Sequence, residues 1–96
     1  MYKFLFTPHF KKKYLRLTRS NFILKKKIAK AFLLLENFPF HPGLKTHKVI
    51  SRRGKSAWSS TISGDLRIIW NFNKGESEVI NLLYICGHSG GNKVYL

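Results

Sequence analysis

The chain has 96 residues, which suits one domain, since a typical domain takes roughly 100–200 residues, and leaves no room for separate catalytic and regulatory domains. Its residues are 44% hydrophobic and 15% aromatic, which excludes a disordered tail and predicts a folded core. Eighteen lysines and arginines against four acids give a net charge of +14, which points to a polyanionic or strongly acidic partner.

The first part of the chain predicts a short strand followed by two helices. Residues 2–6 are β-prone, and Thr7-Pro8 is typical of a helix N-cap followed by proline in the first turn. The first helix has an apolar face formed by Phe10, Tyr14 and Leu17. Ser20 or Asn21 can cap the second helix, whose apolar stripe comprises Leu24, Ile28, Ala31, Phe32 and Leu35. Prolines at positions 39 and 42 end it, so the two helices are expected to pack as a hairpin.

From residue 45 the apolar pattern changes from helical to β-type. The β-prone segments are residues 47–51, 57–62, 66–72 and 79–86. Residues 63–65 are a hairpin signal, and residues 94–96 are a candidate short last strand. We therefore expect an α+β fold of the order β-α-α-β-β-β, in which the helical hairpin covers one face of a largely antiparallel, twisted sheet.

The excess of positive charge belongs to the first part of the chain. Residues 1–55 hold 15 of the 18 basic side chains and one acid, Glu36, whereas the charges of residues 56–96 cancel. Such an unbalanced surface repels itself unless an anionic partner covers it. The candidate contacts for this partner lie in two lysine triplets and around an arginine pair: Lys11, Lys12, Lys13, Lys25, Lys26, Lys27, Lys48, Arg52, Arg53 and Lys55.

The sequence lacks the residues that several classes of protein chemistry require. Cys86 is the single cysteine and lies in an apolar run, so we expect no disulfide and an inert core thiol. The histidines and acids do not have metal-site spacing, and no P-loop or serine-hydrolase motif occurs, so neither metal nor cofactor is expected. No apolar stretch approaches the roughly 18–20 residues that span a bilayer, and the N-terminus lacks signal-peptide features. We therefore expect a cytoplasmic protein without a membrane partner.

A metal-free ribonuclease is compatible with this residue set. RNA supplies its own nucleophile, the 2′-hydroxyl, so the protein must accept one proton, donate another and stabilise charge on the phosphate. Histidine suits both proton transfers near neutral pH, and arginine suits the phosphate. The candidates are His47, Arg67 and His88, with Tyr95 as a stacking or phosphate-donating side chain. Both tryptophans, at positions 58 and 70, are interpreted as core residues.

Two segments of the chain resemble a known protein family. They are the tryptophan-bounded hairpin of residues 58–70 and the glycine-rich segment of residues 82–95. With the length, the charge and the element order, they are similar to the RelE/ParE superfamily of type II toxins. The likeness covers nearly the whole chain, and within the superfamily the YafQ-type ribonucleases are most similar.

The resemblance implies a single toxin domain over residues 1–96 that cleaves mRNA by metal-independent 2′-OH transesterification in association with the ribosome. It further implies a cognate antitoxin that holds the toxin inactive in a hetero-oligomer, the toxin alone being a monomer. The basic residues named above would then contact RNA or the ribosome. The catalytic residues implied by the family motif are His47, Asp65, Arg67, His88 and Tyr95. YafQ-type toxins carry a further histidine where this chain has Thr61.

Two alternatives stay open at the level of sequence. A ParE-like toxin inhibits DNA gyrase by binding and has no ribonuclease activity. Such proteins generally lack a pair like His47 and His88, so this pair discriminates against that alternative. The other alternative is a nucleic-acid-binding module with an inactive site. The state of cellular mRNA after induction of the protein separates the three hypotheses.

Overall fold

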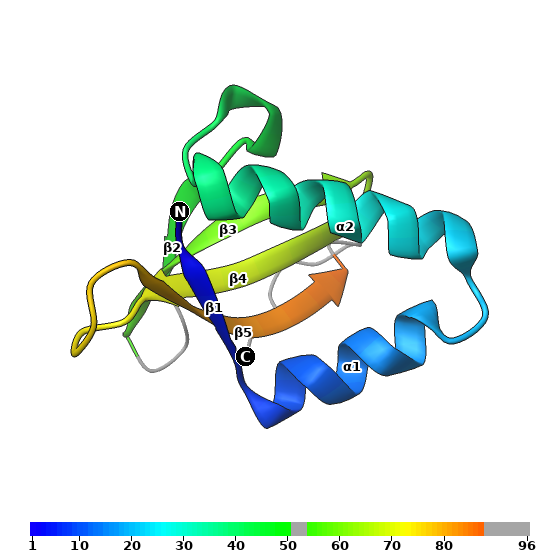
Figure 1. Cartoon of the computed structure of the whole chain (residues 1–96), viewed down its shortest axis with the longest axis horizontal. Coiled ribbons are helices and arrows are strands. Elements are labelled where there is room, and N and C mark those ends of the chain that lie inside the picture. The colour runs from blue at the N-terminus through cyan, green and yellow to red at the C-terminus, as the bar shows by residue number, and fades with distance from the viewer. Residues whose placement is uncertain (51–53, 88–96) are drawn as a thin grey trace.

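The computed structural model describes residues 1–50 and 54–87, which form an α+β fold. In chain order the elements are β1 (Lys3–Phe6), α1 (Pro8–Thr18), α2 (Phe22–Asn37), the 3₁₀ turn η1 (Pro42–Leu44), β2 (His47–Ile50), β3 (Ser56–Ser63), β4 (Leu66–Phe72) and β5 (Val79–Gly87) (Figure 1). All four β-prone segments between residues 47 and 86 form strands. Four strands therefore follow the helices, one more than in the expected order β-α-α-β-β-β. The candidate strand at residues 94–96 lies outside the described residues.

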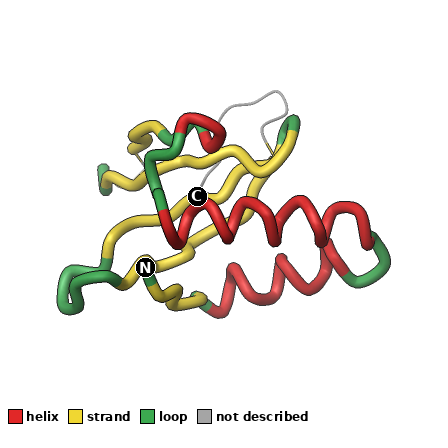
Figure 2. Tube along the Cα trace, turned by 45° about the horizontal axis from the view of Figure 1, so that its top comes forward, coloured by secondary structure: helices red, strands yellow, loops and turns green. Residues whose placement is uncertain are grey.

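The strands form one mixed sheet in the order β1-β5-β4-β3-β2. β1 runs parallel to β5, and the other neighbouring pairs are antiparallel. Both helices lie against the same face of this sheet, and no helix of the described residues covers the opposite face (Figures 1 and 2). The expectation of a helical hairpin on one face of a largely antiparallel sheet is therefore confirmed.

The helices begin where the capping residues predict. The Thr7 hydroxyl accepts a hydrogen bond from the Phe10 amide at 3.2 Å, and Pro8 occupies the first turn of α1. Asn21 caps α2, because its side-chain oxygen accepts from the Leu24 amide at 3.0 Å. Each helix then turns its apolar stripe towards the sheet, and the shared core is formed by Phe10, Ala31, Leu35, Leu44, Ile68, Trp70, Ile80, Leu82 and Ile85.

A chain of buried hydrogen bonds fixes the centre of β3 and β4. The indole nitrogen of Trp70, a fully buried residue, donates to the Ser60 hydroxyl at 2.8 Å. That hydroxyl is 2.7 Å from the Thr46 hydroxyl, which donates in turn to the Pro39 carbonyl oxygen at 2.7 Å. Trp70 is thus a core residue, as expected, while Trp58 is half-buried and packs at the edge of the same cluster.

The β3–β4 hairpin and the neighbouring strand pair contain irregularities that shift side chains between faces. Gly64 turns the hairpin with a φ of 42°, in the left-handed region that favours glycine. The β3–β4 register shifts between Thr61 and Ser63, and the β4–β5 register shifts between Ile69 and Trp70. Because of the second shift, residues 80, 82 and 85 of β5 all contribute to the core beneath the helices.

Candidate active site

The face of the sheet away from the helices, here called the distal face, carries the candidate catalytic side chains. In a paired sheet, residues opposite one another across neighbouring strands share a face. His47 of β2 pairs with Ser59, Ser59 pairs with Ile69, and two residues further along Thr61 pairs with Arg67. Across the next strand pair, the distal face is continued by Tyr84 and Cys86 of β5.

Arg67 is held on the distal face by a side chain of the neighbouring strand. Its guanidinium donates through Nη1 to the hydroxyl of Thr61, the residue directly opposite on β3. Both side chains are half-buried, whereas Ile68 and Trp70, the next residues with the opposite orientation, belong to the core. Because a guanidinium has five N–H donors, the bond to Thr61 leaves others available for a phosphate.

His47 lies at the start of β2, where its side chain is exposed. Its Nδ1 is 3.1 Å from the carbonyl oxygen of Lys45, a residue in the left-handed conformation with a φ of 50°. In the tautomer protonated at Nδ1, the ring donates to that carbonyl and keeps Nε2 as a free acceptor, which is the form a general base requires. From the strand spacing, the Cα atoms of His47 and Arg67 are about 12 Å apart, so a phosphodiester fits between their side chains.

The remaining catalytic candidates are less closely grouped. Asp65 is an exposed residue of the β3–β4 turn, at the end of the hairpin rather than on a strand face. His88 and Tyr95 lie outside the described residues. The structure therefore brings His47, Thr61 and Arg67 to one face, and puts Asp65 at its margin.

Cys86 is not the core thiol that its apolar surroundings in the sequence suggested. It is half-buried and directly opposite Arg67 on the distal face, while its neighbour Ile85 points into the core. Burial raises the pKa of the Cys86 thiol, and the nearby positive charges of Lys13 and Arg67 partly oppose this rise. Because the thiolate is the nucleophilic form, the raised pKa lowers the reactivity of this thiol.

The candidate contacts for an anionic partner are spread over several elements. Lys11, Lys12 and Lys13, here called the α1 triplet, differ in that Lys13 is half-buried and the other two are exposed. The α2 triplet, Lys25, Lys26 and Lys27, is exposed throughout, and the Lys26 ammonium lies 5.3 Å from the centre of the Phe22 ring. Lys48 and Lys55 are also exposed, whereas Arg52 and Arg53 lie outside the described residues.

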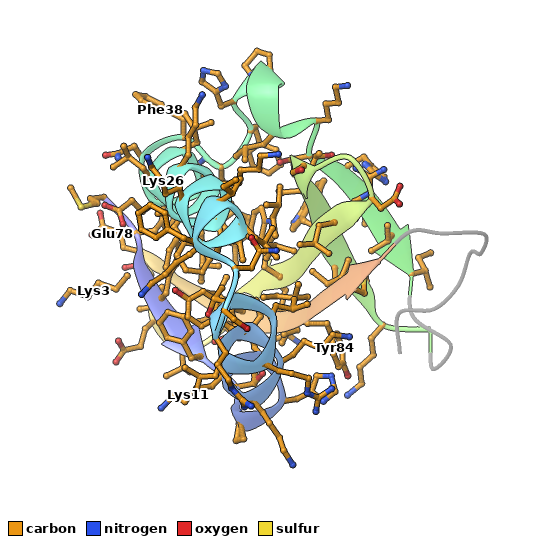
Figure 3. All side chains as sticks on the ribbon, turned by 90° about the vertical axis from the view of Figure 1, so that its right-hand side faces the viewer. Lys3, Lys11, Lys26, Phe38, Glu78 and Tyr84 are labelled. Atoms are coloured by element: carbon orange, nitrogen blue, oxygen red, sulfur yellow. The ribbon has the colours of Figure 1, made fainter. Side chains whose placement is uncertain are left out.

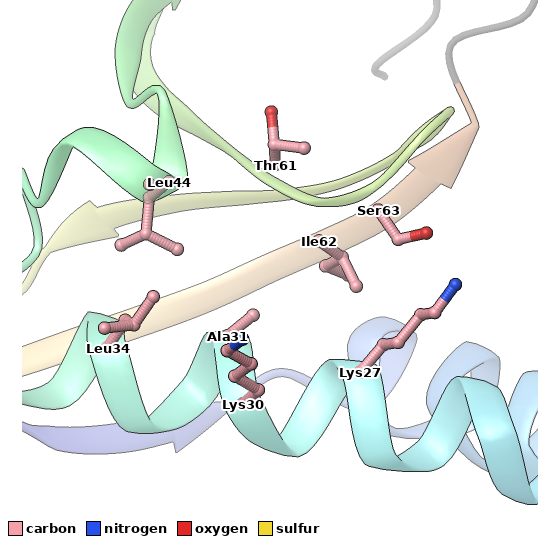
Figure 4. Close-up of a pocket in the computed structure, with 9 residues that line it drawn as sticks. Lys27, Lys30, Ala31, Leu34, Leu44, Thr61, Ile62 and Ser63 are labelled. Atoms are coloured by element: carbon pink, nitrogen blue, oxygen red, sulfur yellow. The ribbon is translucent and has the colours of Figure 1, made fainter.

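A pocket of about 280 Å³ opens on the helix side of the sheet, between α2 and the end of β3. Lys27 and Lys30 of α2 bring two positive charges to it, beside apolar side chains that include Leu34 and Leu44 (Figure 4). Thr61 contributes to the wall, but in Figure 4 its hydroxyl points away from α2. The pocket and the distal face therefore meet only at β3.

The sequence predicts neither a metal site nor a membrane-spanning helix, and the structure describes residues 1–50 and 54–87. Within these ranges, no group of three or more histidine, cysteine or acidic side chains is arranged to hold a metal ion. Within the same ranges, no helix has the length and apolar character needed to cross a membrane.

The fold is that of the RelE/ParE superfamily toxins. A metal-bound toxin from Helicobacter pylori superposes with a TM-score of 0.72 at 24% identity, over 93% of this chain and 97% of its own. The YoeB/ParE toxin from Agrobacterium tumefaciens gives 0.72 at 18% identity, over 90% and 98% of the two chains. YafQ from Escherichia coli superposes with a TM-score of 0.66 at 15% identity, over 93% of this chain and 96% of its own.

These matches concern the fold alone, since their sequences have diverged below a quarter identity. No protein-family model matches the sequence, and no curated protein matches it either. The expected resemblance to the superfamily is therefore confirmed at the level of three-dimensional structure.

Proposed function

We propose that the protein is a type II toxin and a metal-independent endoribonuclease that cleaves mRNA in association with the ribosome, with residues 1–96 as its single domain. The observation that carries the proposal is the grouping of His47, Thr61 and Arg67 on the distal face of a RelE/ParE toxin fold. A general base and a phosphate-binding cation within reach of one phosphodiester are the minimum for attack by the 2′-hydroxyl.

In the proposed reaction the 2′-oxygen of the RNA attacks the adjacent phosphorus as His47 removes its proton. Arg67 stabilises the negative charge that grows on the non-bridging oxygens. The bond from phosphorus to the 5′-oxygen breaks, and that oxygen leaves with a proton for which His88 is the candidate donor. The products are a 2′,3′-cyclic phosphate and a 5′-hydroxyl. Asp65 and Tyr95 are proposed as supporting residues of this site, on the family likeness.

The proposed partners are the ribosome with its mRNA and a cognate antitoxin. The excess of positive charge on the two helices suits ribosomal RNA, since lysines that neutralise phosphates release counterions and gain affinity. An antitoxin is supported by a structure with the same fold, which was solved as a YoeB-YefM complex from Staphylococcus aureus. We propose a monomer for the free toxin and a hetero-oligomer for the complex, in the cytoplasm.

Cleavage of a reporter mRNA by purified protein on ribosomes tests the proposal directly. The wild type should give fragments with 2′,3′-cyclic phosphate ends, without added metal. Arg67→Ala should lower the rate about 10²–10³-fold, the usual effect of losing one donor to a developing anion, and His47→Ala or His88→Ala about 10²–10⁴-fold, the usual effect of losing a proton-transfer group. Lys74→Ala, at an exposed turn distant from the distal face, is the control.

The ParE-like alternative predicts inhibition of gyrase in place of mRNA cleavage. A gyrase poison would leave the mRNA intact and would block DNA supercoiling by purified gyrase. Intact mRNA with inhibited gyrase would refute the ribonuclease proposal, and RNA binding without either activity would indicate an inactive nucleic-acid-binding module. The exposed imidazole of His47, whose Nδ1 lies 3.1 Å from the Lys45 carbonyl oxygen, favours the ribonuclease.

A further inference from the structure

One flank of α1 runs alongside the last strand, next to the candidate active site. β1 pairs with β5 only as far as Leu82, so within residues 1–50 and 54–87 the rest of β5 has no strand on that side. α1 takes this place, because the Thr7 amide donates to the Leu82 carbonyl at 3.2 Å and the Thr7 hydroxyl donates to the Leu83 carbonyl at 3.1 Å. The helix is thus fixed to the strand that carries Tyr84 and Cys86.

Two side chains of α1 meet two side chains of β5 along this contact. His9 and Lys13 are four residues apart and share one flank of the helix. Tyr84 and Cys86 are two residues apart and share the distal face. The rings of His9 and Tyr84 are in edge-to-face contact at 5.0 Å between centroids, and the charge of Lys13 acts on the Cys86 thiol. Lys11 lies on the side of α1 away from Tyr84 (Figure 3).

The charges of Lys13 and Arg67 therefore converge on one place from different elements. Arg67 approaches Cys86 from the opposite strand, where directly paired Cβ atoms are about 4.5–5.5 Å apart. Lys13 follows His9 by one turn of α1, and its charge acts on the same thiol. Cys86 contributes no negative charge that would neutralise the two cations, because burial keeps it protonated.

We propose that Lys13 and Arg67 together form a phosphate-binding subsite for single-stranded RNA, with the Tyr84 ring beside it as a surface for the adjoining base. Cations next to an aromatic ring are typical of proteins that track a single strand, and the Tyr84 ring is half-buried beside this place. An acidic peptide would also bind the two cations, but it carries no base that could stack on the Tyr84 ring. This inference rests on the proposed function, and it separates Lys13 from the other lysines of the α1 triplet.

The test uses a ligand that cannot be cleaved. A 2′-O-methyl RNA hexamer lacks the attacking hydroxyl, so its affinity reports binding without chemistry. Lys13→Ala should weaken hexamer binding about tenfold and reduce the slope of log K against log salt by about 0.7, the value for one phosphate contact on a single strand. Lys3→Ala removes the same charge on the far side of the molecule and should change neither quantity (Figure 3).

Cys86 provides an independent reporter of the same place. Its pKa, measured by the pH dependence of alkylation with iodoacetamide, should rise in Lys13→Ala and in Arg67→Ala and stay unchanged in Lys3→Ala. Bound hexamer should raise the pKa in the wild type and have no such effect in Lys13→Ala. Equal hexamer affinity and equal thiol pKa in the Lys13 and Lys3 variants would overturn the inference.

The outcomes distinguish this inference from the proposed function. Cleavage of mRNA by the wild type together with hexamer binding that ignores Lys13 would refute the subsite and leave the ribonuclease intact. Lys13-dependent hexamer binding by a protein that cleaves nothing would support the subsite and refute the ribonuclease. A Lys13→Ala protein that loses antitoxin affinity and keeps hexamer affinity would assign the lysine to the protein partner, against the inference.

Discussion

Thr61→Val removes the hydroxyl that holds Arg67 and keeps the shape of the side chain. Valine has the same branching and favours strands, so β3 should form as before and the thermal midpoint should stay near that of the wild type. The Arg67 guanidinium loses its acceptor on the neighbouring strand and becomes free to adopt other rotamers. The substitution therefore changes the position of a catalytic candidate while keeping its charge.

The structure sets the size of the expected effect. A hydrogen bond to a charged group contributes about 1.5–3 kcal/mol, and the lower end applies because both Thr61 and Arg67 are half-buried. A loss of about 1.4 kcal/mol in the transition state lowers the rate roughly tenfold. Thr61→Val should therefore lie between the wild type and Arg67→Ala in single-turnover mRNA cleavage, while Thr61→Ser should retain most of the activity.

Two measurements on Thr61→Val test this positioning role. If Thr61→Val cleaves mRNA at the wild-type rate while Arg67→Ala is inactive, Arg67 acts without the help of Thr61. If instead the thermal midpoint of Thr61→Val falls by many degrees, the hydroxyl is needed for folding and the kinetic comparison carries no information on Arg67. Measuring the melt and the rate on the same protein preparations separates these cases.

Further predictions concern the core, the second lysine triplet and the thiol. Ser60→Ala leaves the buried Trp70 indole N–H without an acceptor and should cost about 1–3 kcal/mol of unfolding free energy, whereas Trp70→Ala should cost about 3–5 kcal/mol; denaturant titration measures both. Neutralising the α2 triplet should weaken ribosome binding with a shallower salt dependence and leave turnover at saturating ribosome unchanged, and a normal salt slope would contradict a ribosomal role. Since burial raises the pKa of Cys86 above its usual 9.0, the thiol's contribution to stability is complete below pH 9 and is lost as the pH rises further. The stability advantage of the wild type over Cys86→Ala should accordingly shrink above pH 9, and a constant difference in chemical denaturation would refute this.

Local patterns were enough to predict both helices and the five strands of the described residues. The capping residues Thr7 and Asn21 and the stripes with helical spacing act within a few residues, so they can be recognised before the chain is folded. Because successive side chains of a strand point to opposite faces, the sequence of β4 also predicts that Arg67 faces away from the core residues Ile68 and Trp70. The parallel pairing of β1 with β5 depends on contacts between the two ends of the described chain, and no local pattern contains it.

The composition of the candidate site was only partly accessible from sequence, because it depends on register. The bond from Arg67 to Thr61 follows from a pairing that a shift of one residue would destroy. Family likeness indicated Asp65 as a site residue, but its place in the hairpin turn gives it no fixed direction on the distal face. Three adjacent lysines look alike in a sequence, although successive helical residues point about 100° apart. In the structure Lys13 is half-buried, whereas Lys11 and Lys12 are exposed.

The spatial arrangement of β4 explains how the same short strand can serve both stability and chemistry. Its core side chains pack under the helices, while Arg67 faces the opposite side and contributes nothing to that packing. Substitutions of Arg67 should therefore alter activity at little cost in stability, and substitutions of Ile68 or Trp70 should do the reverse. α1 links the two sides, because one surface of the helix buries Phe10 in the core while its flank brings His9 against Tyr84, with Lys13 one turn further along. A partner that displaced α1 from β5 would consequently disturb the proposed phosphate subsite without touching Arg67.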